Sequence, residues 1–211
     1  MFKSVLILSA LASISAVPIL SEEEHILAIR PEIIEAVNKA KTTWKASSVP
    51  VKFQNATVAD VKRLLGTIMP GEKGYAAPEM EKLVFGVQSS DIPDSFDVRD
   101  AWPQCASITG HVRDQSDCGS CWAFGSTEAF NDRHCIATGD GKTLFSPEDT
   151  NSCCSGPVCQ FSMGCNGGQP SGAWNWFVKV GVSSGGDYAD VGTGTSCKVI
   201  YITNHKIKYL H

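Results

Sequence analysis

The stretch Gln115-Ser116-Asp117-Cys118-Gly119-Ser120-Cys121-Trp122-Ala123-Phe124 decides the fold, because it places two cysteines at close spacing directly ahead of a helix-like run. Gly119-Ser120 is typical of the entry to a helix that continues towards Ala137, and Gly139 predicts its end. A helix N-terminus favours an anion. A thiolate attacks far better than a thiol, and an unperturbed cysteine titrates at about 8.5, so a reactive cysteine needs such support. We therefore interpret Cys121 as a candidate nucleophile.

A nucleophilic cysteine also needs hydrogen-bond donors for the oxyanion that forms when its sulfur adds to a carbonyl. The backbone N–H of Cys121 and the side-chain amide of Gln115 are the candidate donors. In isolation, a C-x-x-C pair is often a redox pair or half of a zinc site. A zinc site would want a second such pair or two spaced histidines, and a redox site would want a βαβ context. We find neither, and the flanking Gln115 and Trp122 favour the nucleophile.

The composition is that of an ordinary globular protein with an unusual number of cysteines. The 211 residues carry a net charge of -4, which provides no basic patch for nucleic acid. Nine cysteines indicate an oxidising compartment. Lys3 and the apolar run that follows it predict a signal peptide over residues 1–16, with cleavage near Ala16. No later stretch approaches 20 apolar residues. We therefore expect a soluble product of the secretory pathway, lysosomal or extracellular, with no membrane partner.

Residues 17–91 contain no cysteine, whereas all nine lie between Cys105 and Cys197, and this asymmetry predicts a boundary near residue 91. Within 17–91, two short amphipathic helices are predicted. One begins at Pro31 and the other at a capping box. Such small helices bury too little to be stable alone, so we expect them to dock near Cys121. Their predicted features are the face Ile33, Val37, Ala40 and Trp44, the capping box Thr57 to Asp60, the face Val61, Leu64 and Leu65, the stop Gly66, and a glycosylation sequon at Asn55.

From Ile92 the chain becomes rich in loops and cysteines. Ser146-Pro147 predicts a capped helix start. Further on, Cys165-Asn166-Gly167-Gly168 leads into a helix that carries Trp174 and Phe177. Paired glycines let the backbone of a ligand approach closely. Without the motif around Cys121, a flexible turn before the next helix would be an equally good interpretation of Gly167-Gly168.

Together these motifs resemble a cathepsin B-like member of the papain family of cysteine peptidases. The resemblance implies an α+β papain-like fold, here mainly its helical left half over residues 92–192, after a short helical propeptide. It also implies that Cys121 is the nucleophile, that Gln115 lines the oxyanion hole, and that Gly167, Gly168 and Trp122 bind substrate. The matching stretches are Lys41 to Trp44, Lys62 to Thr67, Trp102 to Cys105, Gln115 to Phe124, Asp132-Arg133, Cys153-Cys154 and Gly164 to Gly168.

The resemblance further implies three disulfide bonds and a missing second half. It pairs Cys105 with Cys135, Cys118 with Cys165, and Cys154 with Cys159, which leaves Cys153 and Cys197 without partners. In the family, a β-rich half delivers the catalytic histidine and its asparagine, but residues 193–211 do not match it. None of the five histidines stands at a matching position: His25, His111, His134, His205 and His211. We therefore expect a truncated chain that is inactive alone and has an apolar open face.

Two functions remain open at this point. The first is a cysteine peptidase of cathepsin B-like type that hydrolyses peptide bonds in peptides and proteins. The second is a non-catalytic fragment that binds peptides or inhibitors. Neither function requires a metal or a cofactor. The expected partners are peptide substrates, the chain's own propeptide and, by resemblance, cystatin-like inhibitors.

Overall fold

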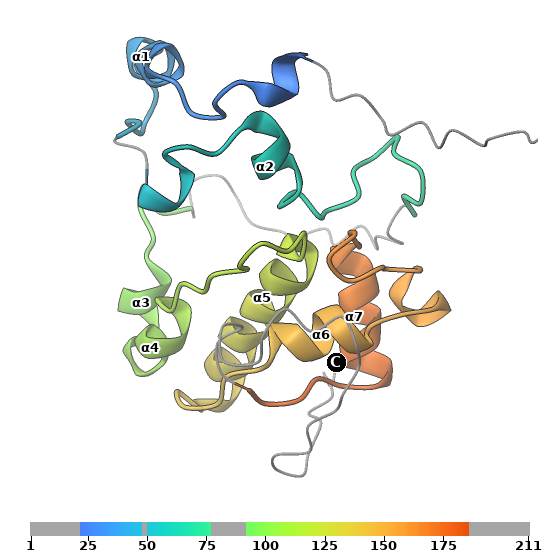
Figure 1. The fold of residues 1–211 in the computed structure, drawn as a ribbon. Helices are drawn as coiled ribbons and strands as arrows, with labels where there is room; N and C mark the ends of the chain where they lie inside the picture. The colour runs from blue at the N-terminus through green and yellow to red at the C-terminus, as the bar shows by residue number, and fades with distance from the viewer. Residues whose placement is uncertain (1–21, 48–49, 77–91, 186–211) are drawn as a thin grey trace, which may run out of the picture. The chain divides into compact units, whose positions relative to one another are not determined.

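The computed structural model describes residues 22–47, 50–76 and 92–185 (Figure 1). The chain divides into two compact units, Met1–Asp60 and Val61–His211. The predicted signal peptide and the tail 193–211 lie outside the described residues. The described α-helices are α1 (Pro31–Lys39), α2 (Val58–Lys62), α3 (Val98–Ala101), α4 (Ala106–Thr109), α5 (Cys121–Thr138), α6 (Pro147–Cys153) and α7 (Pro170–Lys179), and the 3-10 helices are η1 (Glu22–His25), η2 (Val51–Phe53), η4 (Pro103–Cys105) and η5 (Pro157–Cys159).

In the first unit, α1 begins at Pro31 as predicted but ends earlier than its apolar pattern suggests. The helix stops at Lys39, and Lys41 adopts a left-handed conformation with φ of 51°. The side chain of Asn38 then bonds to both the N–H and the C=O of Ala46, which closes the turn. Trp44 therefore lies outside the helix, and its predicted place on the helical face is wrong.

The second predicted propeptide helix is present but short. Its capping box is confirmed, because Thr57 N–H donates to Asp60 Oδ2 while Asp60 N–H donates to Thr57 Oγ1. The helix ends at Lys62 rather than at Gly66. The predicted apolar face is wrong for Leu65, which lies beyond the end of the helix and is 69% exposed.

In the second unit, α5 is the central element. It packs against α4, α6 and α7 (Figure 1). Its buried residues include the consecutive Trp122, Ala123 and Phe124, which lie on different sides of a helix. As predicted, the helix starts at Cys121, and Gly139 ends it with a left-handed φ of 75°. A helix that is covered on several sides in this way holds its first residue in a fixed position.

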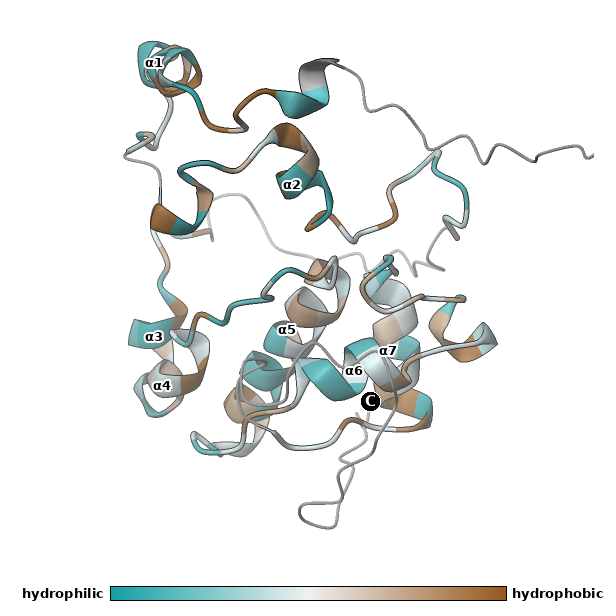
Figure 2. Ribbon diagram, viewed as in Figure 1, coloured by the Kyte–Doolittle hydropathy of each residue, from teal (hydrophilic) through white to brown (hydrophobic). Residues whose placement is uncertain are grey.

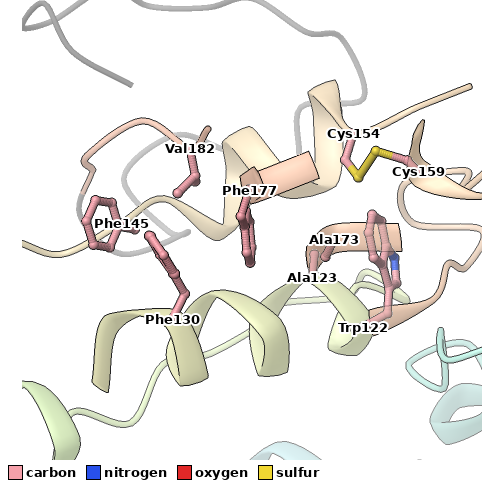
Figure 3. Close-up of a cluster of buried hydrophobic side chains, with 9 residues drawn as sticks. All are labelled: Trp122, Ala123, Phe130, Phe145, Cys154, Cys159, Ala173, Phe177 and Val182. Carbon is pink, nitrogen blue, oxygen red and sulfur yellow. A yellow bond between two sulfur atoms is a disulfide. The ribbon is translucent and has the colours of Figure 1, made fainter. Parts of the chain in front are cut away.

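An aromatic cluster joins α5 to α7 and to the loop at Phe145. The ring of Phe130 lies 4.7 Å from that of Phe145 and 5.1 Å from that of Phe177, and all three are buried (Figure 3). Trp122 and Ala123 from the start of α5 continue the same cluster towards Ala173 (Figure 3). The main apolar core therefore extends along α5 from its first turn, at Trp122 and Ala123, to Phe130.

Helix α6 is buried although its sequence is hydrophilic (Figure 2). Its N-cap is the predicted Ser146, whose Oγ accepts from Asp149 N–H. Its buried polar groups find partners in neighbouring segments: Thr150 Oγ1 lies 2.9 Å from Thr127 Oγ1 of α5, and Asp149 Oδ2 accepts from Ser183 N–H. Hydrogen bonds rather than apolar area attach this helix to the rest of the unit.

All three disulfide bonds that the resemblance implied are present: Cys105–Cys135, Cys118–Cys165 and Cys154–Cys159. Cys153 is also disulfide-bonded, so the prediction that it lacks a partner is wrong. Spacing alone could not have settled its state. Cys197 lies outside the described residues, among which Cys121 is the free thiol.

Within the described ranges, no helix is both long and apolar enough to cross a bilayer. Exposed apolar side chains in the mature part include Val112, Phe161 and Met163. They are dispersed along the sequence, and the predicted apolar open face stays a prediction.

We expect Phe130→Ala to lower the free energy of unfolding by about 3 to 5 kcal/mol, because it would leave a cavity at the centre of the aromatic cluster. Phe161→Ala is the matched control. Its ring is 69% exposed, so the change should stay within about 0.5 kcal/mol. Urea unfolding with the disulfides intact measures both values. Equal effects of the two substitutions would contradict the proposed core.

Candidate active site

Cys121 is the first residue of α5, where the helix directs its N-terminal N–H groups and dipole towards the sulfur. The side chain is partly exposed and not disulfide-bonded. Its neighbour in the motif, Cys118, is bonded to Cys165, which excludes a redox pair between Cys118 and Cys121. The structure thus places a free, partly exposed thiol at the first residue of a helix.

The sulfur of Cys121 faces a segment that belongs to the propeptide part of the sequence. Gly66 N–H donates to Cys121 Sγ at 3.2 Å, and Thr67 Oγ1 lies 3.3 Å from the same sulfur. Both residues lie in the same compact unit as Cys121. The sulfur of Cys121 therefore contacts one N–H and one hydroxyl group of its own chain.

Gln115, the predicted oxyanion donor, has a carboxamide that bonds to two carbonyl oxygens. Its Nε2 donates to Cys118 O at 2.7 Å and to Leu64 O at 2.9 Å. The first bond fixes the carboxamide against the active-site loop, and the second shows that the amide can hold a carbonyl oxygen beside Cys121. A donor that is already oriented in this way is what stabilises an oxyanion.

The segment that carries Gln115 is anchored two residues earlier by Arg113. The Arg113 side chain is 1% exposed, and its Nε lies 3.1 Å from Glu128 Oε1 on α5. Its Nη1 also donates to Phe145 O at 2.7 Å. The ion pair attaches the segment before Gln115 to α5, the helix that begins with Cys121, and the hydrogen bond attaches it to the loop at Phe145.

Gly168 pairs through both of its backbone groups with the segment that covers Cys121. Its N–H donates to Gly66 O at 2.8 Å, and its C=O accepts from Ile68 N–H at 3.0 Å, which makes a parallel bridge centred on Thr67. The preceding Gly167 has φ of 111°, a conformation that glycine adopts readily and other residues rarely do. Gly167 uses its N–H and C=O within its own turn, with Gly164 and Met163, so Gly168 alone makes the backbone pairing, and the predicted role of the two glycines in substrate binding stays a prediction.

Close contacts require glycine at several positions around Cys121. A Cβ on Gly66 would lie 1.6 Å from Gly119 O, and a Cβ on Gly119 would lie 2.5 Å from Cys165 O. A Cβ on Gly168 would lie 2.5 Å from the Trp122 ring. Since real Cβ atoms do not approach this closely, side chains at these positions would force the backbones apart.

Trp122 lies in the core with Gly168 against its ring, rather than at the surface. It is completely buried, and its Nε1 donates to Gly164 O at 3.1 Å. Any contribution to substrate binding would therefore pass through Gly168, which rests on its ring.

No histidine of the described ranges contacts the sulfur of Cys121, whose hydrogen-bond partners there are Gly66 and Thr67. His134 stands 13 residues further along α5, a separation of about 20 Å at about 1.5 Å per residue. It packs against Phe145 and lies 3.9 Å from Asp140 Oδ2. His205 and His211 lie outside the described residues. The described part of the chain therefore holds the predicted nucleophile and the predicted oxyanion donor, with no histidine at the sulfur.

Comparison with known proteins agrees with this site. Residues 92–209 match the family described as papain family cysteine protease, and residues 30–71 match the peptidase family C1 propeptide. The chain belongs to the papain family of cysteine proteases. The papain-family match runs to residue 209, past Gly192, where the predicted resemblance ends.

The similar papain-family proteins include two from Caenorhabditis elegans. The chain is 41% identical to cathepsin B-like cysteine proteinase 5 over 181 residues, which cover 84% of this chain and 48% of the relative. It is 40% identical to cathepsin B-like cysteine proteinase 4 over 188 residues, which cover 87% of this chain and 51% of the relative. The chain therefore spans about half the length of the curated relatives that it matches.

Among solved structures, procathepsin B S9 from Trypanosoma congolense is similar with a TM-score of 0.57 and 29% identity. The match covers 75% of this chain and 52% of that one. The predicted papain-like fold with a helical propeptide is confirmed by these comparisons.

Two features of the site were not predicted. The sequence predicts Gly66 as the end of a helix. In the structure its backbone packs closely against Gly119, and its N–H donates to Cys121 Sγ. A glycine-threonine pair after a short helix is a weak signal for such a role. Gln169 carries no motif of its own, and its contacts with residues 74–76 become visible only in the folded chain.

We expect Gly66→Ala to accelerate alkylation of Cys121 by iodoacetamide about tenfold or more, because the added Cβ displaces the segment that donates to the sulfur. Gly125→Ala is the matched control, since that glycine of α5 has open space around it. Mass spectrometry of the labelled peptide identifies the reacting cysteine. An unchanged rate in Gly66→Ala would show that the segment does not restrict the thiol.

Proposed function

We propose that this chain is the precursor form of a cathepsin B-like cysteine peptidase, in which residues 64–68 occupy the active site. The observation that carries the proposal is the placement of the Leu64 carbonyl at Gln115 Nε2 while Gly168 pairs with the backbone on the other side of Cys121. A substrate would use the same two contacts. Its scissile carbonyl would take the place of the Leu64 carbonyl, and its backbone would take the place of residues 66–68.

In the proposed reaction, Cys121 Sγ attacks the scissile carbonyl carbon and forms a carbon–sulfur bond. The carbonyl oxygen becomes an oxyanion, which Gln115 Nε2 and the Cys121 N–H stabilise. When the carbon–nitrogen bond breaks, the leaving amine takes a proton from a general acid. Water then hydrolyses the thioester and frees the thiolate. In this proposal the described residues provide the nucleophile and the oxyanion donors, and the acid and base come from outside them.

The direction of the bound segment explains why it is held without being cleaved. Leu64 lies at the oxyanion donor, and the residues that follow it pair with Gly168. In a substrate, the residues that precede the scissile carbonyl would pair with the glycines, so the covering segment runs in the opposite direction. Moreover, an N–H of this segment, that of Gly66, points at Cys121 Sγ, and an N–H offers the sulfur no electrophile.

A second candidate function is a non-catalytic peptide- or inhibitor-binding fragment. It is favoured by the same contacts at Cys121, since the described site is filled and lacks a histidine next to the sulfur. Cystatin-like proteins are the class of inhibitor that we propose for an exposed papain-like site.

We also propose that the protein acts in the secretory pathway, in a lysosomal or extracellular compartment. The three disulfide bonds of the described residues support an oxidising environment during folding. Asn55 lies exposed in a turn after η2, which supports its use as a glycosylation site.

Hydrolysis of a dipeptidyl-arginine fluorogenic substrate tests the proposal. We expect no turnover by residues 1–211 above a Cys121→Ser control, and Cys121-dependent turnover once the chain continues into a second half of the family type. In that longer protein, Gln115→Ala should lower kcat about 10²- to 10³-fold, because it removes one oxyanion donor.

Turnover by residues 1–211 that Cys121→Ser abolishes would show that the base lies within this chain. If the longer protein binds the substrate but does not hydrolyse it, the binding fragment is the better description.

A further inference from the structure

Gln169 has a buried side chain whose two polar groups both bind the main chain of the covering segment. The residue is 2% exposed. Its Nε2 donates to Gly74 O at 2.8 Å, and its Oε1 accepts from Ala76 N–H at 3.1 Å. Both bonds lie inside the second compact unit.

These two bonds repeat the pattern that Gly168 makes with its main chain. Gly168 contacts the C=O of residue 66 and the N–H of residue 68, and Gln169 contacts the C=O of residue 74 and the N–H of residue 76. In each case the bonded groups belong to residues i and i+2, which is how one strand pairs with a parallel neighbour. The carboxamide of Gln169 thus acts as a side-chain copy of a peptide group.

The backbone around Gln169 holds this carboxamide in place. Gln169 is the N-cap residue of α7, yet its side chain makes no capping bond. Its N–H donates to Ser162 Oγ, and Pro170 follows it as the first helical residue. The backbone of Gln169 is therefore held by Ser162 on one side and by the start of α7 on the other. Its side chain bonds to residues 74 and 76 and not to its own helix.

We infer that Gln169 is a second binding position for peptide main chain, separate from the glycine pair, and that it retains residues 74–76 whichever side chains they carry. A buried carboxamide is stable only where both its donor and its acceptor are bonded, and residues 74–76 satisfy both. Between the two attachment points, the chain turns at residues 69–75, where Met69 N–H donates to Glu72 Oε2. Two separate attachments hold this segment more firmly than one.

The inference rests on the proposed function, in which residues 64–68 cover Cys121, but its test needs no catalysis. Lys73 is exposed and directly precedes Gly74, so trypsin can cleave the bond between them only after residues 74–76 leave Gln169. Lys52 of the first unit is also exposed and provides an internal reference. The test uses residues 1–211 with Cys121→Ser in every sample, so self-cleavage cannot contribute.

We expect Gln169→Leu to raise the rate of cleavage after Lys73, relative to that after Lys52, about tenfold, because two hydrogen bonds to the segment are lost. Hydrogen exchange at Ala76 should accelerate by a similar factor. Gln160→Leu is the matched control, since the carboxamide of Gln160 bonds to Ser171 and not to the segment. Its cleavage ratio should equal that of the parent.

A cleavage ratio and an exchange rate that stay unchanged in Gln169→Leu would overturn the inference. Gln169→Glu provides a second variant if the first fails to fold. It keeps the acceptor for Ala76 N–H but loses the donor to Gly74 O, so an intermediate acceleration supports the inference and parent-like values contradict it. Failure of the peptidase proposal would appear in the fluorogenic assay instead and would leave these ratios untouched.

Discussion

Three stretches of backbone meet at Cys121 with no space for a Cβ between them. Gly66 passes Gly119 at a distance that only glycine permits, Gly119 itself lies against Cys165, and Gly168 rests on the Trp122 ring. Because these positions are glycines, the Gly66 N–H comes within hydrogen-bond distance of Cys121 Sγ. Side chains at these positions would keep the backbones too far apart for this bond. Gly119 lies between the Cys118–Cys165 bond and the first turn of α5, which begins at Cys121. The Gln115 carboxamide bonds to the carbonyl of Cys118, the residue before Gly119.

The features that could be predicted from the sequence are local or carried by the family resemblance. The capping bonds at Ser146 and Thr57 and the left-handed stop at Gly139 depend on residues within one helical turn, so their signals lie next to them in the sequence. The disulfide pairing followed from the resemblance, since nine cysteines allow many combinations.

The features that could not be predicted depend on long-range contacts. The end of α1 at Lys39 reflects bonds between Asn38 and Ala46, although the apolar spacing alone suggests that the helix continues. Helix α6 is hydrophilic, and only the partners that it meets after folding explain its burial. Likewise, Gln169 bonds to residues 93 and 95 positions earlier in the chain, and Gly66 bonds to Cys121, 55 positions later.

The site region depends on polar contacts as much as on apolar burial. The buried side chain of Arg113 forms an ion pair with Glu128 and donates to the carbonyl of Phe145. Asn151 Nδ2 lies 3.7 Å from the sulfur of Cys118. Networks of this kind fix side-chain positions more narrowly than apolar packing does, because each bond has a preferred direction. In this structure they hold the segment before Gln115 and the loop at Cys118 in place.

The reversed direction of residues 64–68 has a practical consequence for inhibitor design. Gly168 bonds to main-chain groups of this segment, and Gly66 presents an N–H to Cys121 Sγ rather than an electrophilic carbon. A synthetic ligand with the same direction could therefore vary its side chains, provided that it keeps a glycine at the crossing with Gly119. Such a ligand would compete with substrates without itself being digested.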